Sequence, residues 1–158
     1  KKFVLVVGYR SEILKEYISS KFNESNLNGM KIEYIENPIY DKTNNIYSLW
    51  LAKEHLLNDD TILLESDVIF DEKILFDIIK SPEKNLAMVS RFEPWMDGTC
   101  TLLDEEKNIV GMLDKTHFRW SDINEYYKTV NIYKLSKEFS TKYYIPFLEA
   151  YQKAFGKN

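Results

Sequence analysis

The sequence predicts an α/β fold with a mostly parallel, mixed sheet flanked by helices. Three observations carry this prediction. The first two are that β-branched apolar runs alternate with stretches of helical periodicity up to Arg91, and that strand patterns dominate the segment that follows. The third is size, because 158 residues that are 44% hydrophobic and 15% aromatic suffice for one substantial core. We therefore predict a single domain over residues 1–158.

The first strand and helix begin at the start of the chain. The run FVLVVGY at residues 3–9 is apolar and β-branched and contains a glycine near its end, which is typical of a central strand. Through residues 11–22, apolar side chains recur at helical spacing on one face, and Ser11 is a suitable N-cap.

A second strand and helix are expected between residues 31 and 57. KIEYIEN at 31–37 alternates apolar and polar residues and is closed by Pro38. NNIYSLWLAKEHLL at 44–57 has its apolar residues at helical spacing, which predicts one continuous helix.

The same order repeats once more before the pattern changes. TILL at 61–64 predicts a strand that is buried on both faces, Asp71 is a candidate cap for the helix EKILFDIIK at 72–80, and LAMVSR at 86–91 predicts another strand. This alternation implies right-handed crossovers between parallel neighbours.

After Arg91 the sequence is rich in strand patterns and ends in a helix. GTCTLLDEEKNIVGMLD predicts a hairpin with DEEKN as its turn, and YYKTVNIYKLS at 126–136 predicts a further strand. From Ser136 the pattern is helical, and Pro146 either kinks this helix or begins a new one at its first turn.

Composition and charge exclude several classes of protein. With 29% charged residues and a net charge of −4, the chain is not expected to bind nucleic acid, and a phosphate ligand would need local neutralisation. One cysteine, Cys100, with no apolar leader and no bilayer-length apolar run, indicates a cytoplasmic protein without a membrane partner. Since His55 and His117 lack metal-ligand spacing and Cys100 has no partner, neither zinc chemistry nor a thiol nucleophile is expected.

The stretch TILLESDVIF places Asp67 directly after an apolar strand. In open α/β sheets, ligands bind beyond the carboxyl ends of the strands. A carboxylate there would suit Mg²⁺, which takes one or two carboxylates together with substrate phosphates and water. The alternative is a capping or loop aspartate.

Four stretches, in this order and spacing, resemble the nucleotidyltransferases that make nucleotide-diphospho-sugars: FVLVVGYRSEILKEYI, NPIYDKTNNIYSLWLAKE, LLESDVIFD and YKTVNIYKLS. The branch they most resemble contains phosphocholine cytidylyltransferases and related enzymes that act on phosphonates. The resemblance covers nearly the whole chain, and NPIYDKTNNIYS is its most specific piece. It implies a Rossmann-like nucleotide-diphospho-sugar transferase fold.

The resemblance also implies a reaction. A substrate phosphate or phosphonate attacks the α-phosphorus of a nucleoside triphosphate in line, and pyrophosphate leaves. Asp67 matches the first metal-binding aspartate of the family, which makes it the predicted catalytic residue and the ligand of a Mg²⁺ cofactor.

The segment 41–45 matches the part of the family that lies beside the nucleobase. The predicted nucleotide-binding residues are Lys42, Thr43, Asn44 and Asn45. An ordinary helix N-terminus, capped by Thr43 or Asn44, is the alternative, and both descriptions can hold together.

Two irregular segments, RFEPWMDGT and HFRWSDINEYY, combine aromatic rings with acids, which would suit a choline or amine group through cation–π attraction and charge pairing. An arginine could meet the acceptor phosphate. The predicted acceptor-binding residues are Arg91, Glu93, Trp95, Asp97, Trp120 and Asn131. The alternatives are aromatics that cover the hairpin, a surface arginine, and a buried, satisfied amide at Asn131.

Two motifs of the family are missing from the sequence. There is neither a glycine-rich GxGxR loop, which would hold the triphosphate, nor a late acidic segment with a second metal ligand. We therefore expect a domain that lacks its first strand and its C-terminal segment, which a fused or associated domain could supply.

Three functions stay open, in the order given. The first is transfer of a nucleotidyl group, in particular from CTP, to phosphocholine, aminoethylphosphonate or a sugar phosphate. The second is a GT-A-like glycosyltransferase, since ESD resembles the acid-x-Asp motif that binds the metal of a sugar nucleotide. The third is a non-catalytic binding or assembly domain on the same scaffold.

Overall fold

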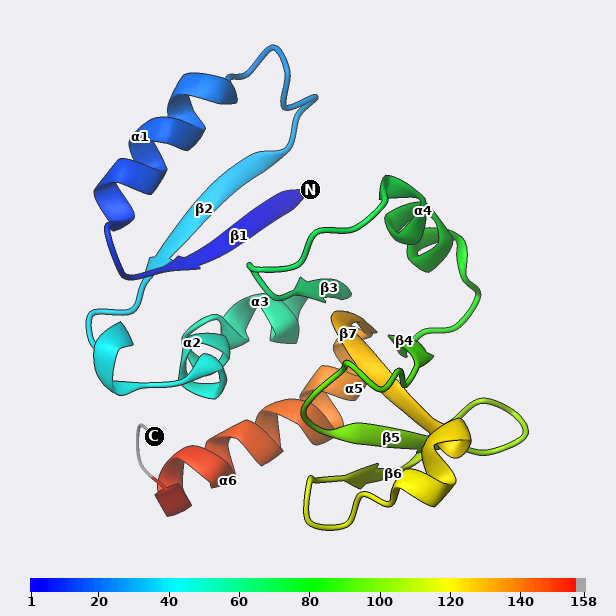
Figure 1. Ribbon diagram of the computed structural model, residues 1–158. Helices are drawn as coiled ribbons and strands as arrows, with labels where there is room; N and C mark the ends of the chain where they lie inside the picture. Colours follow the sequence, from blue (N-terminus) through cyan, green and yellow to red (C-terminus); the bar gives the residue numbers. More distant parts are fainter. Residues whose placement is uncertain (156–158) are drawn as a thin grey trace. The chain divides into compact units, whose positions relative to one another are not determined.

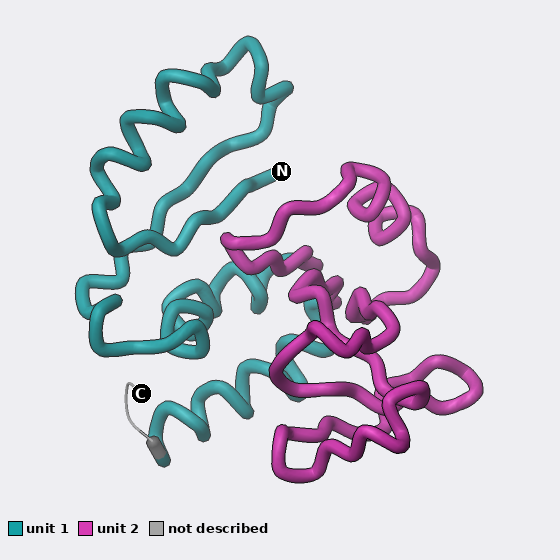
Figure 2. Tube along the Cα trace, in the orientation of Figure 1, with its two compact units in different colours: residues 1–59, 137–158 teal, residues 60–136 magenta. Residues whose placement is uncertain are grey.

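The computed structural model describes residues 1–155 (Figure 1). The chain forms two compact units (Figure 2). The first contains residues 1–59 together with the helical segment that starts at Lys137, and the second contains residues 60–136.

The first unit holds a parallel pair of strands. β1 (Lys2–Val7) and β2 (Lys31–Glu36) pair in parallel along their whole length, and α1 (Ser11–Lys21) connects them (Figure 1). The predicted strands and helix are therefore confirmed. The predicted cap is wrong, because Arg10 occupies the N-cap position with a left-handed φ of 50° and no side-chain hydrogen bond, and Ser11 is already helical.

Six helical segments complete the first unit. They are η1 (Tyr40–Lys42), α2 (Asn45–Leu51), α3 (Lys53–Asn58), α5 (Lys137–Phe139), the π-helical segment η3 (Ser140–Tyr144) and α6 (Ile145–Phe155). Buried side chains on α2, α3 and α6 form the core here: Tyr47, Leu56 and Leu148. An ion pair of 2.9 Å between Lys53 Nζ and Glu149 Oε1 also joins α3 to α6.

Two details of these helices differ from the simplest expectation. The single helix predicted at 44–57 is divided at Ala52, whose ψ of 5° lies outside the helical range although neither glycine nor proline marks the position. At the other end of the chain, Ile145 N–H donates to Ser140 O, five residues back, and Pro146 lies in the first turn of α6. The helical run continues without a break from Lys137 through the π-helical segment into α6, since Phe139 and Ile145 both have right-handed helical dihedral angles. Of the two alternatives for Pro146, a new helix start is therefore wrong, and the proline lies inside one run, just after its π-helical turn.

The second unit is an antiparallel sheet. Its strands are β3 (Thr61–Leu64), β4 (Leu86–Arg91), β5 (Cys100–Leu103), β6 (Ile109–Leu113) and β7 (Tyr126–Leu135). β7 is central: β3 pairs with its second half, β5 with its first half, and β4 along most of its length, while β6 pairs with β5 as the predicted hairpin.

The largely parallel sheet expected from the sequence is therefore wrong for this unit. Alternating strands and helices predict parallel neighbours only where consecutive strands lie side by side. Here Lys134 of β7 pairs with both Ile62 of β3 and Leu86 of β4, so β7 lies between these strands and runs opposite to both. The four residues of β3 are also half-buried, not buried on both faces.

α4 (Glu72–Lys80) has the bounds that the sequence predicts. Asp71 Oδ1 accepts a hydrogen bond from Lys73 N (2.8 Å), as expected of an N-cap. At the other end, Lys134 Nζ donates to Ile78 O (3.3 Å) and Ser81 O (2.9 Å), which ties the end of α4 to β7.

An aromatic cluster forms the core of the second unit. Phe92, Cys100 and Tyr126 are buried, and the Phe118 ring lies 5.2 Å from that of Phe92 and 5.0 Å from that of Tyr126. η2 (Trp120–Glu125) leads from this cluster into β7. The α/β character of the chain is confirmed, and no helix within residues 1–155 has the length and apolarity to cross a membrane.

Candidate functional site

Asp67 lies three residues beyond β3, where the chain leaves the sheet. Because β3 and β4 both run antiparallel to β7, their carboxyl ends point the same way. The side chain of Asp67 is exposed, and its carboxylate has no hydrogen bond or ion pair with any residue from 1 to 155. Since Asp71 caps α4, Asp67 is not needed as a helix cap.

The donor atoms around Asp67 bear on the Mg²⁺ that the family resemblance implies. In the described part of the chain, no three His, Cys, Asp or Glu side chains gather closely enough to hold a metal ion. Mg²⁺ does not require such a cage, because it retains several waters and takes one or two carboxylates plus substrate phosphates. An exposed carboxylate without a protein partner fits one of these ligands, and Asp67 provides it.

Asn131 lies at an irregularity in β7 beside this strand end. Ala87 pairs with Tyr133 but Val89 pairs with Thr129, so three residues of β7 face one residue of β4. Asn131 is the middle residue of this bulge and has a φ of 59°, a left-handed conformation that asparagine tolerates better than most residues.

Both polar atoms of the Asn131 side chain make hydrogen bonds. Its Nδ2 donates to Glu65 Oε2 (2.8 Å), and its Oδ1 accepts from Thr129 Oγ1 and Tyr133 OH (both 3.3 Å). The Glu65 N–H also donates to Asn131 O (3.2 Å). The structure thus shows a hydrogen-bonded amide at Asn131, as in one of the two alternatives, but the residue is half-buried and not buried.

Asn37, buried at the end of β2, organises the segment that follows it. Its Nδ2 donates to Thr43 Oγ1 (3.0 Å) and Ser48 Oγ (3.2 Å), and its Oδ1 accepts from Ile39 N (3.1 Å). Thr43 Oγ1 in turn donates to Ile39 O (3.0 Å). Asn37 was not a predicted site residue, and its one local signal is its place before Pro38, since an asparagine before a proline is a common turn signal.

The four predicted nucleotide-binding residues divide into two kinds. The Thr43 hydroxyl is used internally, and Asn44 Oδ1 caps α2 by accepting from two N–H groups of its first turn (3.1 and 3.4 Å). Lys42 and Asn45 are exposed, and their side chains make no hydrogen bond within residues 1–155. These two side chains are therefore available to a ligand.

The turns after β1 and β2 meet through aromatic rings, because parallel strands end at the same edge. The rings of Tyr9 and Tyr40 lie 6.1 Å apart, and the Arg10 guanidinium lies 5.2 Å from the Tyr9 ring. Gly8 touches Tyr40 so closely that a Cβ on it would lie 2.5 Å from Tyr40 Cβ. Glycine is needed here for this close approach.

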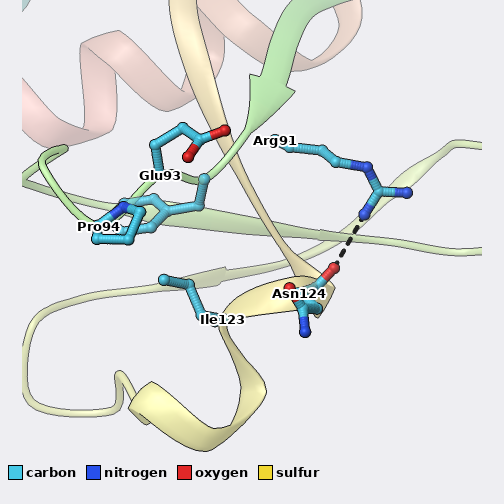
Figure 3. Close-up of a pocket in the computed structure, with 6 residues that line it drawn as sticks. Arg91, Glu93, Pro94, Ile123 and Asn124 are labelled. Atoms are coloured by element: carbon cyan, nitrogen blue, oxygen red, sulfur yellow. Dashed lines mark hydrogen bonds between the residues drawn. The ribbon is translucent and has the colours of Figure 1, made fainter.

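Arg91 and Glu93, two of the predicted acceptor-binding residues, line one pocket of about 290 Å³ (Figure 3). Phe92, Pro94, Ile123 and Asn124 complete its lining. Arg91 Nη1 donates to Asn124 O (3.1 Å), and Figure 3 shows the guanidinium turned toward Asn124 and away from the Glu93 carboxylate. No ion pair joins Arg91 to Glu93 in the part of the chain described.

A second pocket of about 300 Å³ also borders Arg91, with Tyr127, Asp104 and Lys107 among its lining residues. The Arg91 guanidinium lies 5.4 Å from the centre of the Tyr127 ring. Asn124 and Tyr127 both lie in the segment HFRWSDINEYY that was predicted to contact an acceptor, but neither is among the six predicted acceptor-binding residues. The pairing of Arg91 with Tyr127 brings both next to the arginine, and this contact has no local sequence signal.

The other predicted acceptor-binding residues do not line this 290 Å³ pocket. Trp95 is 79% exposed, and Trp120 is 63% exposed with its edge against Phe118 at 5.0 Å. Asp97 bonds Lys115 Nζ at 2.8 Å, and this ammonium group, with the Gly98 N–H, holds the pKa of Asp97 below its usual range. Asn131 lies four residues further along β7 than Tyr127, roughly 13 Å by the rise of a strand.

Comparison with known proteins identifies a family whose profile matches this chain and a curated relative. The sequence profile of a family described as "Domain of unknown function (DUF6564)" matches residues 1–144. The "CMP-5'-(3-aminopropyl)phosphonate synthase" of Streptomyces rubellomurinus (strain ATCC 31215) is 33% identical over 147 residues. That match covers 92% of this chain and 22% of the relative, so the chain spans about a fifth of the relative's length.

Two solved structures share the fold. Apo UDP-glucose pyrophosphorylase superimposes with a TM-score of 0.62 at 9% identity, over 95% of this chain and 63% of that one. UDP-glucose pyrophosphorylase complexed with UDP-glucose gives 0.61 at 10% identity, over 94% and 61%. At such low identity these structures show a common fold, and this chain spans less than two thirds of each.

Proposed function

The chain belongs to the family described as a domain of unknown function (DUF6564), and from this premise we propose that it serves nucleotidyl transfer. In the proposed reaction an acceptor phosphonate or phosphate oxygen attacks the α-phosphorus of a nucleoside triphosphate, foremost CTP. The bond to the β-phosphate breaks, and pyrophosphate leaves.

One observation carries the proposal: 33% identity, over 92% of this chain, to a protein whose name gives a CMP-phosphonate as its product. That identity supports both the cytidylyl group and a phosphonate acceptor. The likeness to UDP-glucose pyrophosphorylase supports the fold on which such chemistry would take place.

Asp67 is the proposed cation ligand, because its exposed carboxylate has no partner in the described part of the chain. When bound, Mg²⁺ would neutralise charge on the phosphates. Lys42 and Asn45, whose side chains are exposed, are proposed to contact the nucleotide. Thr43 and Asn44 shape that segment through their internal hydrogen bonds and can contribute backbone groups.

The pocket beside Arg91 suits an acceptor that carries both charges. A guanidinium has five N–H donors, and one of those in Arg91 is used by Asn124 O, which leaves others for a phosphonate. The exposed carboxylate of Glu93 can pair with an ammonium group. Aminoalkylphosphonates have both groups. Trp95, Asp97, Trp120 and Asn131 lie outside the lining of this pocket and stay predicted acceptor contacts.

The direct test is calorimetric titration of the chain with CTP, UTP, ATP and GTP, with and without Mg²⁺. We expect Mg²⁺-dependent binding with a preference for CTP, and its loss in Asp67→Ala. Asp77→Ala, which removes another exposed carboxylate of the same unit, is the control and should bind as the wild type does. Equal binding by Asp67→Ala would exclude the proposed cation ligand, and binding of a sugar nucleotide without CTP would favour the glycosyltransferase alternative.

The acceptor pocket can be tested with a matched pair of ligands, 3-aminopropylphosphonate and propylphosphonate. Arg91→Ala should weaken binding of both by about tenfold, the scale of a lost hydrogen bond to a charged group. Glu93→Gln should weaken only the ligand with an amine. If Glu93→Gln affects both ligands equally, the carboxylate does not recognise the ammonium group.

A further inference from the structure

We propose that Glu65 and Asn131 form a positioning pair that holds the end of β3, and thereby sets how Asp67 presents its carboxylate to a cation. The pair does so without touching the cation. This inference rests on the proposed role of Asp67 as a cation ligand.

The backbone of Glu65 is bonded to β7. The regular ladder between β3 and β7 ends where Leu64 pairs with Ile132, yet the Glu65 N–H continues it by donating to Asn131 O. Only one residue separates Glu65 from Asp67. The bulge in β7 therefore fixes the chain up to the point from which Asp67 extends.

The side chain of Glu65 is also bonded to β7. Its carboxylate is half-buried and accepts a hydrogen bond of 2.8 Å from Asn131 Nδ2. A charged acceptor makes this bond stronger than one between neutral groups. Backbone and side chain of Glu65 are thus both held by the same residue of β7, which leaves this position little freedom.

An asparagine at position 131 suits both the backbone and the hydrogen bonds. At a φ of 59° most side chains are strained, whereas asparagine and glycine are tolerated. The hydroxyls of Thr129 and Tyr133 donate to the amide oxygen, which orients the amide so that its NH₂ faces Glu65. Glycine would satisfy the backbone alone, so the amide has a separate purpose.

This assignment differs from the acid-x-Asp interpretation of the same residues. There, Glu65 and Asp67 would both bind the cation. In the structure Glu65 is engaged by Asn131, while Asp67 has no partner within residues 1–155. The two carboxylates therefore have different environments, which the proposal explains by different roles.

The test is the affinity of the full chain for Mn²⁺, a spectroscopic substitute for Mg²⁺, measured by electron paramagnetic resonance with and without CTP. Four variants separate the roles. Asp67→Asn should abolish binding, and Glu65→Gln should retain it, because a glutamine oxygen still accepts from Asn131. Asn131→Gly keeps the backbone but removes the amide, and should weaken binding by about tenfold or more, as for residues that orient a metal ligand.

The fourth variant, Glu65→Gln with Asn131→Asp, exchanges donor and acceptor at unchanged net charge and should keep an affinity near that of the wild type. Amide hydrogen exchange separates positioning from loss of fold: in Asn131→Gly the Glu65 amide should exchange faster while amides of α4 keep their rates. If Glu65→Gln loses as much affinity for Mn²⁺ as Asp67→Asn does, Glu65 is itself a ligand and the proposal is wrong. Affinity at the wild-type level in Asn131→Gly would also overturn the proposal. Binding retained by Asp67→Asn, or no binding by the wild type, would overturn the cation role of Asp67 and the positioning pair with it.

Discussion

Gly8 shows how one residue type can be imposed by a neighbour. Its backbone lies against the side chain of Tyr40, with a distance of 2.5 Å from the site of an added Cβ to Tyr40 Cβ. Its φ is not in the left-handed region, so packing alone excludes a side chain. The turn after β1 can therefore pack against the turn after β2 because residue 8 has no Cβ atom.

Gly8→Ala should consequently lower the free energy of unfolding by about 1–3 kcal/mol, the usual cost of overpacking. Gly111→Ala is the matched control, because its Cβ would meet Leu102 Cδ1 at an ordinary 3.4 Å in the strand β6. Urea denaturation of both variants checks the prediction. Similar midpoints for the two would mean that Tyr40 moves aside at little cost.

The lowered pKa of Asp114 should make the stability of the fold depend on pH in acid. Hydrogen bonds from the Thr116 hydroxyl and then from His117, together with the N–H groups of both residues, hold the pKa of Asp114 far below its usual value. A depressed pKa stabilises the folded state above the unfolded pKa, about 4, and this contribution is lost as the pH falls further.

The difference in urea midpoint between the wild type and Asp114→Asn should thus be fully present at about pH 5 and should shrink below about pH 4. Glu105→Gln, which removes an exposed carboxylate from the β5–β6 turn, serves as the control. A difference that persists unchanged in acid would show that the charge of Asp114 contributes nothing to folding.

At the scale of elements, the side chain of Lys134 ties the C-terminal end of α4 to the sheet. Lys134 of β7 donates to the carbonyls of Ile78 and Ser81, which would otherwise lack donors at the end of a helix. A cation at this end also interacts favourably with the helix dipole. The lysine thus performs a structural task inside the second unit.

Lys134→Met should lower the free energy of unfolding by about 1–3 kcal/mol, since two helix-end carbonyls lose their donor. Lys73→Met is the comparison, because Lys73 forms an exposed ion pair with Asp77 on the same helix and such pairs contribute little to stability. Thermal and urea unfolding measure both. Equal losses would contradict the role given to Lys134.

The elements also show what the sequence could and could not predict. The bounds of α4 and β4 agree with the predicted ranges, because a cap and an apolar stripe are local signals. The break at Ala52 has no such signal. Strand direction in the second unit depends on where β7 inserts, which is a property of the assembled sheet and not of any segment.

The same distinction holds for the candidate site. Asp67 could be selected because it follows an apolar run, and the cap at Asn44 because it precedes a helical pattern. The bond between Glu65 and Asn131 joins residues 66 positions apart, and it requires both the register of β3 with β7 and a bulge. Only the folded chain reveals it.

At the scale of the whole molecule, the second unit is one continuous stretch, residues 60–136, with its own sheet and core. We expect this fragment to fold alone and to unfold cooperatively in urea. Its only cysteine, Cys100, is fully buried, and burial raises the pKa of the thiol, so reaction with a thiol reagent should be slow until unfolding.

A fragment of residues 1–59 is the contrasting case, because α6 supplies part of the core of the first unit and is absent from it. We expect that fragment to show no cooperative transition. Rapid reaction of Cys100 in the fragment 60–136 would mean that the second unit depends on the first for its fold.

The three tryptophans differ in environment between the two units, so their fluorescence can distinguish the units. Trp50 stacks on Tyr47 at 5.6 Å in the first unit, whereas Trp95 and Trp120 are mostly solvent-exposed in the second. Emission from Trp50 should lie at a shorter wavelength. The red component, at longer wavelength, should come from Trp95, which follows Arg91, and from Trp120, the first residue of η2. Acrylamide quenching of that red component can therefore follow ligand arrival in the second unit of the unlabelled protein.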